Sequence, residues 1–176
     1  SESVQRKATQ MLGEMHAYPA VYPLLEALRD PEFTFRALAA KALGQIDGRH
    51  AEIGMIQTLN SGDDPDVVLA EIQALGNMKS PNGSRKLVGF LEGPFKIAWE
   101  AAKALRKLDN ERILPELEEL LESKGTGVRE KVAFAFGGIK GKRSIVLLKK
   151  ALKDRDEQVR KMAKASLRDL GKYKSE

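Results

Sequence analysis

Few side chains in this sequence are of the types that usually carry catalysis or bind metals. The 176 residues include no cysteine, and the only histidines are His16 and His50. No Ser–His–Asp order, phosphate-binding loop or calcium-binding loop is present. We therefore expect no metal, no cofactor and no enzymatic activity.

An outward-facing stripe of helix positions is the strongest indication of binding. A stripe of helix positions that faces outward is normally polar, but here apolar residues interrupt it at Leu69, Trp99 and Phe134. Lysines flank them in the same or neighbouring units, at Lys41, Lys103 and Lys161. Exposed aromatic residues rimmed by charge are typical of binding sites. We expect a peptide or helix of another protein to bind here; the alternative is ordinary packing against the adjoining repeat.

The sequence repeats a unit of 30 to 32 residues, and Glu71 stands at a position where the other units have alanine or valine. A carboxylate that faces a core needs a partner or a raised pKa. Perturbed carboxylates also cluster at functional sites. We favour the structural interpretation, in which the side chain reaches water or an arginine.

The elements that position these residues repeat along the chain. Apolar anchors stand 30 to 32 residues apart, at Leu12, Leu43, Leu75, Leu105, Phe136 and Leu167. The residues eight before and three after each anchor are also apolar, which predicts one buried helix face per unit. A second amphipathic segment precedes each of the last five, and Asp64 and Asp156 are predicted helix N-caps. The expected units are a half repeat or cap over 1–17 and repeats over 18–48, 49–80, 81–110, 111–141 and 142–176, in a single domain.

The repeated motif resembles a known family. Asp30-Pro31-Glu32-Phe33-Thr34-Phe35-Arg36, followed by Ala39 and Ala42-Leu43-Gly44, is similar to the HEAT-like repeat of the phycobilisome-lyase type. The pattern recurs in altered form along nearly the whole chain. The resemblance implies an all-α, right-handed α-solenoid with about five repeats and an N-terminal half repeat. It implies little about function, because this repeat serves unrelated roles.

The resemblance also implies a structural role for a set of charged residues. In similar repeats, aspartate and arginine form ladders between adjacent units. The residues that match are Asp30, Arg36, Arg129, Asp154 and Arg160. Asp30 and Asp154 each lie six residues before an arginine, Arg36 and Arg160 respectively.

Charge is unevenly distributed along the chain. Residues 140–176 carry 13 Lys and Arg against 5 Asp and Glu, whereas residues 1–139 carry 17 against 20. A basic end can mark an anionic partner. HEAT-like DNA glycosylases, which cradle DNA on a basic face, make nucleic-acid binding an alternative function. The acidic balance of residues 1–139 argues against a continuous phosphate-binding track.

These observations favour a non-enzymatic scaffold or adaptor that binds a peptide or helix on its concave surface. A bilin lyase-like subunit is a further alternative, because the repeat resembles that of such lyases, which handle tetrapyrroles. No apolar run approaches the ~20 residues needed to span a bilayer, so we expect no membrane partner. With no signal-peptide pattern at the N-terminus, we expect a cytoplasmic protein.

Overall fold

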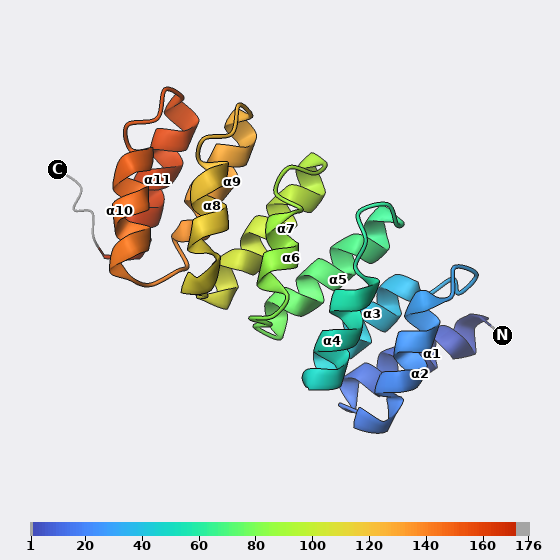
Figure 1. The fold of residues 1–176 in the computed structure, drawn as a ribbon. Helices are drawn as coiled ribbons and strands as arrows, with labels where there is room; N and C mark the ends of the chain where they lie inside the picture. Colours follow the sequence, from blue (N-terminus) through green and yellow to red (C-terminus); the bar gives the residue numbers. More distant parts are fainter. Residues whose placement is uncertain (1, 172–176) are drawn as a thin grey trace. The chain divides into compact units, whose positions relative to one another are not determined.

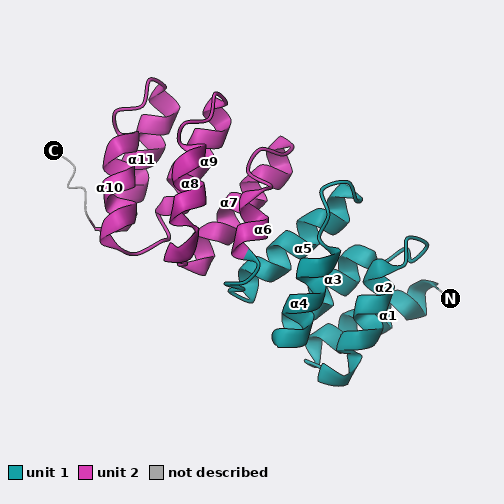
Figure 2. Ribbon diagram, viewed as in Figure 1, with its two compact units in different colours: residues 1–83 teal, residues 84–176 magenta. Residues whose placement is uncertain are grey.

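The computed structural model describes residues 2–171, and the secondary structure found there is entirely helical. The residues group into two compact units, 1–83 and 84–176 (Figure 2). Each unit is a stack of helix pairs joined by short loops (Figure 1). The fold class is therefore the predicted one, all-α with HEAT-like helical repeats. Among the described residues, no helix has both the length and the apolar character that crossing a membrane requires.

Unit 1 begins with the unpaired helix expected from the sequence and continues with two helix pairs. Its helices are α1 (Glu2–Glu14), α2 (Val21–Arg29), α3 (Arg36–Ile46), α4 (Arg49–Thr58) and α5 (Pro65–Asn77), with a 3₁₀ turn at Tyr18–Ala20. The second helices of the repeats, α1, α3 and α5, pack side by side, and α2 packs on α3. Gly44 allows this close approach, because a Cβ added there would lie 2.7 Å from the Cβ of Ala74.

Unit 2 repeats the arrangement with three helix pairs. Its helices are α6 (Ser84–Val88), α7 (Phe95–Leu108), α8 (Leu114–Leu120), α9 (Thr126–Phe136), α10 (Lys142–Ala151) and α11 (Glu157–Asp169), with a 3₁₀ turn at Glu111–Ile113. Here α9 lies between α7 and α11 and packs against both. This places side chains of α7 and α9 on a shared surface.

The predicted anchors form the centre of both units. All of them except the half-buried Leu12 are at most 1% exposed, namely Leu43, Leu75, Leu105, Phe136 and Leu167. Burying a side chain of this size contributes about 1.5–3 kcal/mol each. Helix starts also follow the sequence: the carboxylates of Asp64 and Asp156 accept from the backbone N–H two residues on, at 2.8 Å each. The repeat period thus defines the core and the helix ends.

Candidate functional site

Three aromatic rings form a cluster on unit 2. Phe95 and Trp99 are four residues apart on α7 and therefore share a helix face. The Trp99 ring meets the ring of Phe134 on α9 edge to face, with centroids 5.5 Å apart and planes at 76°. Phe95 meets Trp99 at 6.4 Å and 68°. We call Phe95, Trp99 and Phe134 the aromatic cluster.

The aromatic cluster is open to solvent. Phe95 is 76% exposed, the highest value among the large exposed hydrophobic residues of the described chain. Trp99 and Phe134 are half-buried. Aromatic surface that stays in contact with water in a folded protein is a frequent mark of a binding site.

Arg106 covers one edge of the cluster. Its guanidinium carbon lies 4.4 Å from the centroid of the Phe134 ring, a cation–π contact. Its Nη1 donates to the Phe134 carbonyl oxygen at 2.8 Å, and its Nη2 pairs with Asp169 on α11. Arg106 thus fixes the backbone that carries Phe134 and places a guanidinium, paired with Asp169, beside the rings.

Lys131 lies beneath the cluster. Only 5% of the residue is exposed, although it carries an ammonium group. Its Nζ lies 5.1 Å from the Trp99 ring centroid and 5.3 Å from that of Phe95, and it donates to the Gly127 carbonyl oxygen at 3.0 Å. Burial lowers the pKa of Lys131. The site therefore combines three aromatic rings with one surface cation and one buried amine.

The structure corrects the expectation for Leu69. This residue is 6% exposed and lies within a run of buried residues from Val67 to Ile72 on α5. It is therefore a core residue and cannot anchor a partner. The prediction failed because α5 is buried on more than one face, unlike an ordinary amphipathic helix. The position that the repeat pattern places outward is therefore covered as well.

The three predicted flanking lysines are all exposed, but their surroundings differ. The Nζ of Lys103 pairs with Glu100 at 2.8 Å and that of Lys161 pairs with Glu157 at 2.8 Å, each on its own helix. Lys41 lies on unit 1, where it lines a hollow of about 380 Å³ between α3 and α5 together with Gln45 and Gln73. Of the three, only Lys103 shares a helix with a ring of the aromatic cluster.

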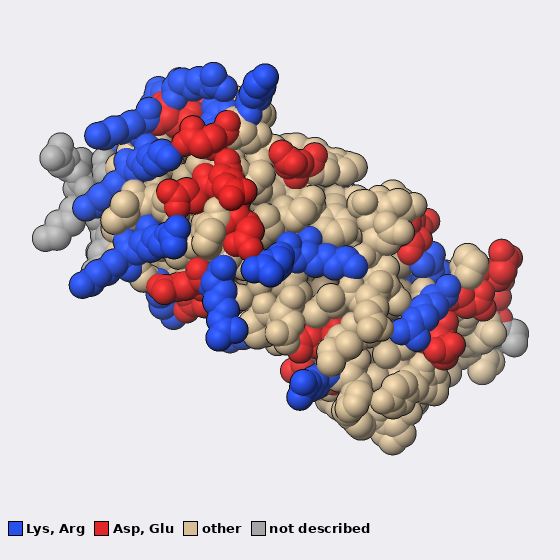
Figure 3. Space-filling model, viewed as in Figure 1, with Lys and Arg blue, Asp and Glu red and all other residues tan. Residues whose placement is uncertain are grey.

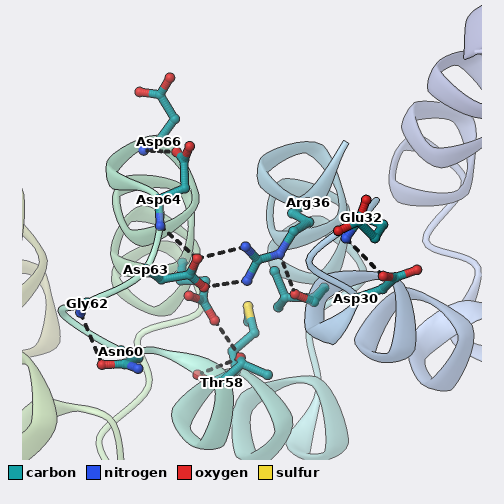
Figure 4. A network of polar contacts seen from close by, with 12 residues as sticks. Asp30, Glu32, Arg36, Thr58, Asn60, Gly62, Asp63, Asp64 and Asp66 are labelled. Atoms are coloured by element: carbon teal, nitrogen blue, oxygen red, sulfur yellow. Dashed lines mark hydrogen bonds and ion pairs between the residues drawn. The ribbon is translucent and has the colours of Figure 1, made fainter. Parts of the chain in front are cut away.

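The arginine ladder of unit 1 connects different residues from those expected. Arg36 donates to both carboxylate oxygens of Asp63, which lies in the loop of the next repeat (Figure 4). Its Nε donates to the Leu28 carbonyl oxygen at 2.9 Å. The carboxylate of Asp30 instead accepts from the N–H of Glu32 at 3.0 Å. The predicted pairing of Asp30 with Arg36 is thus wrong, because this local turn engages the aspartate.

Unit 2 repeats the ladder with a nearly buried pair. Arg129 on α9 donates its Nε and Nη2 to Asp154, in the loop before α11, at 2.8 and 3.0 Å. Arg160 donates its Nη1 to the Asp154 carbonyl oxygen, at 2.7 Å. The hydrogen bond between the partners raises the pKa of Arg129 and lowers that of Asp154. These contacts give the arginines a structural task.

Glu71 is fully buried and belongs to the same network as Arg36. Its Oε1 accepts from the hydroxyl of Thr58. The hydrogen bond to Asp63 raises the pKa of Arg36, and the charge of Glu71 adds to the effect. The Thr58 hydroxyl therefore binds this carboxylate and the charge of Arg36 acts on it, but the buried side chain does not reach water, which was one form of the structural interpretation.

Sequence reasoning did not identify Phe95 and Lys131. Phe95 opens α7 directly after Gly93-Pro94, outside the repeated columns, so no periodic signal marks it. Lys131 lies five residues before its anchor, where the other units have Lys7, Leu38, Ala70, Glu100 and Met162, so this mixed column does not mark a buried lysine.

The described residues contain no group of three or more metal-binding side chains. Basic side chains gather over the C-terminal helices α10 and α11 on the face shown in Figure 3. Several are paired with carboxylates of neighbouring elements, such as Arg143 with Glu118 and Lys150 with Glu122. The basic end is therefore partly neutralised by its own surroundings.

Comparison with known proteins identifies the repeats. Residues 1–76 and 86–168 match the family of HEAT repeats. The chain belongs to the HEAT-repeat family. This assignment covers both units and agrees with the helix pairs described above.

One curated relative points to an enzyme. The chain is 30% identical over 150 residues to phycocyanobilin lyase subunit alpha of a Picosynechococcus species, covering 77% of this chain and 56% of the relative. The chain thus spans about half the length of this relative. The expectation that the protein has no enzymatic role is contradicted, because the relative is a subunit of a lyase. That expectation rested on the lack of familiar catalytic motifs, and such a lack does not exclude a role in an enzyme.

Solved structures of other HEAT-like and armadillo proteins share the fold. One is the complex of CpcE and CpcF of phycocyanin lyase from Nostoc, with TM-score 0.61, 24% identity and coverage of 96% of this chain and 72% of that chain. An archaeal HEAT-like repeat protein from Thermococcus onnurineus gives a TM-score of 0.63 at 17% identity, with coverage of 100% of this chain and 82% of that chain. A designed armadillo repeat protein in complex with the peptide (KR)4 gives a TM-score of 0.60 at 16% identity, with coverage of 96% of this chain and 92% of that chain. Nucleic-acid binding finds no support among these relatives.

Proposed function

We propose that this HEAT-repeat chain is a subunit of a bilin lyase-type enzyme and that its aromatic cluster holds a linear tetrapyrrole. The observation that carries the proposal is the contact of Trp99 with Phe134 on an open surface, with Arg106 beside it. The sequence relationship to a phycocyanobilin lyase subunit supports the same substrate class.

The chemistry of a tetrapyrrole fits this surface. Its conjugated rings are planar and apolar, so they stack on aromatic side chains. Its carboxylates are anionic, so they are attracted to cations at the rim of the site. Phe95 and Trp99 offer ring surface, and the pigment's carboxylates would compete with Asp169 and Glu100 for Arg106 and Lys103 on the same helix. The cytoplasmic location expected from the sequence stays a prediction.

Fluorescence titration with phycocyanobilin tests this proposal. Trp99 is the only tryptophan of the sequence, so its fluorescence reports on the aromatic cluster alone. We expect saturable quenching when the pigment binds. Phe134→Ala should raise the Kd about two- to tenfold, since one aromatic contact contributes roughly 0.5–1.5 kcal/mol.

A matched control uses an exposed aromatic residue of unit 1. Tyr22 is 62% exposed and lies outside the cluster, so Tyr22→Ala should leave the Kd unchanged. The proposal fails if quenching does not saturate, or if both variants weaken binding equally.

A partner protein is the second candidate for the same surface. The exposed ring of Phe95 favours it, because aromatic residues are enriched among the residues that dominate protein interfaces. The Nostoc relative was solved as a complex of two lyase proteins. A pull-down with the Trp99→Ala/Phe134→Ala double variant tests this candidate: loss of a partner that the wild type retains supports it, and undiminished capture removes it.

A further inference from the structure

Lys131 has no carboxylate to neutralise it among the described residues. Most acidic side chains on the helices that pack against α9 are engaged with other cations, in the pairs Glu100–Lys103, Glu118–Arg143, Glu116–Arg85, Asp169–Arg106 and Glu157–Lys161; the remaining one, Glu119 on α8, is exposed. The one acidic residue whose charge acts on Lys131 is Glu130, its neighbour on α9. A structural lysine normally has a carboxylate partner when it is buried.

The surroundings of Lys131 act on its amine in two directions: the ring faces and the Gly127 carbonyl oxygen favour the ammonium, whereas loss of water favours the neutral amine. Aromatic rings lie on one side, and a single hydrogen bond to Gly127 leaves the other ammonium protons without a described acceptor. Desolvation favours the neutral amine, and burial accordingly lowers the pKa of this group. Lysines in apolar pockets become nucleophiles by this route.

Access to the amine depends on an exposed side chain. Phe95, which contacts both Lys131 and Trp99, is 76% exposed and stands at the first turn of α7. Rotation of an exposed ring needs no rearrangement of the core. A planar molecule that displaces the Phe95 ring would then lie against Trp99 with its edge toward the amine.

We propose that Lys131 is a nucleophilic amine at the aromatic cluster that forms an imine with planar aromatic aldehydes. The lone pair of Nζ adds to the carbonyl carbon, and a C–N bond forms. The carbonyl oxygen takes up the protons and leaves as water, which gives a C=N bond. The step needs neither oxidant nor reductant, and it does not depend on binding of a tetrapyrrole.

Reductive trapping tests the proposal. The full chain is incubated at pH 7 with 4-hydroxybenzaldehyde and cyanoborohydride, whose hydride reduces the imine to a stable secondary amine. Peptide mass spectrometry then gives the modified fraction at each lysine. We expect Lys131 to react at least tenfold faster than the exposed Lys103, which is paired with Glu100.

Two comparisons separate a built site from general lysine chemistry. Butanal, an aliphatic aldehyde, should lose the preference for Lys131, because it cannot stack on the rings. In Lys131→Arg, which keeps the positive charge, the fast-reacting site should vanish while labelling elsewhere stays the same.

The outcomes are distinct. Preferential aromatic labelling of Lys131 supports the proposal even if phycocyanobilin does not bind. Labelling that is no faster at Lys131 than at Lys103, or equal for both aldehydes, overturns it and leaves the tetrapyrrole proposal standing.

Discussion

Arg129 and Asp154 form a two-point ion pair between successive repeats of unit 2. The guanidinium side chain is 3% exposed and the carboxylate side chain 11% exposed, so water screens the pair poorly. The third nitrogen, Nη1, donates to the Ser123 carbonyl oxygen at 2.8 Å. All three guanidinium nitrogens of Arg129 therefore form hydrogen bonds that hold the loops of adjacent repeats together.

Removing the charge of Asp154 should destabilise unit 2. Asp154→Asn leaves the Arg129 guanidinium buried without a counter-charge, and loss of one partner of such a pair costs about 3 kcal/mol. Urea unfolding followed by circular dichroism measures the change. Arg85→Gln is the control, because the Arg85 side chain is 80% exposed in its pair with Glu116 and should contribute under ~1 kcal/mol. Equal losses for the two variants would contradict the argument.

The ladder of unit 1 should make stability sensitive to acid. The hydrogen bond from Arg36 lowers the pKa of Asp63 in the folded state below its unfolded value of about 3.9. The contribution of the pair is therefore complete above about pH 4 and is lost as the pH falls through the folded pKa. The free-energy difference between wild type and Asp63→Asn should be constant from pH 7 to pH 5 and smaller at pH 3. A difference of the same size at pH 3 and pH 7 would exclude this linkage.

Close packing of second helices predicts a cost for a single methyl group. In Gly44→Ala the new Cβ would lie 2.7 Å from the Cβ and 3.0 Å from the Cα of Ala74, so the helices must separate. We expect a loss of about 2 kcal/mol, as for other overpacked cores. Gly62→Ala is the matched change in the same unit, because its nearest neighbour would be 3.7 Å away, and it should cost nothing. Thermal unfolding of both variants decides the point.

The sequence predicted the fold well because the core repeats. Leu43 and Leu75 are buried as the period requires, and the N-cap of Asp64 forms as expected from its side chain and the following proline. Such features depend on local spacing and chemistry, which a sequence displays directly.

The site was harder to predict because it depends on how neighbouring helices meet. The period places Leu69 on an outward-facing stripe, yet the structure buries it. The pairing of Arg36 with Asp63 joins residues 27 positions apart, so six-residue spacing within one repeat could not reveal it. Lys131 was missed for the same reason: its burial arises from the rings of Phe95 and Trp99 on another helix.

The buried amine predicts a pH dependence of opposite sense to that of Asp63. Because burial lowers the pKa of Lys131, the folded protein binds fewer protons than the unfolded chain between the folded pKa and about 10.4. Stability should therefore rise with pH over that range. Lys131→Met removes the titrating group and keeps a side chain of similar length, so wild type should gain stability relative to this variant from pH 7 to pH 10. Urea unfolding at each pH gives the difference.

Glu130, the one carboxylate that acts on Lys131, is unchanged in both proteins. Lys131→Arg is the control: arginine stays charged throughout, so its difference from Lys131→Met should not vary with pH. A flat wild-type curve would mean that the Lys131 amine is as well solvated in the folded protein as in the unfolded chain.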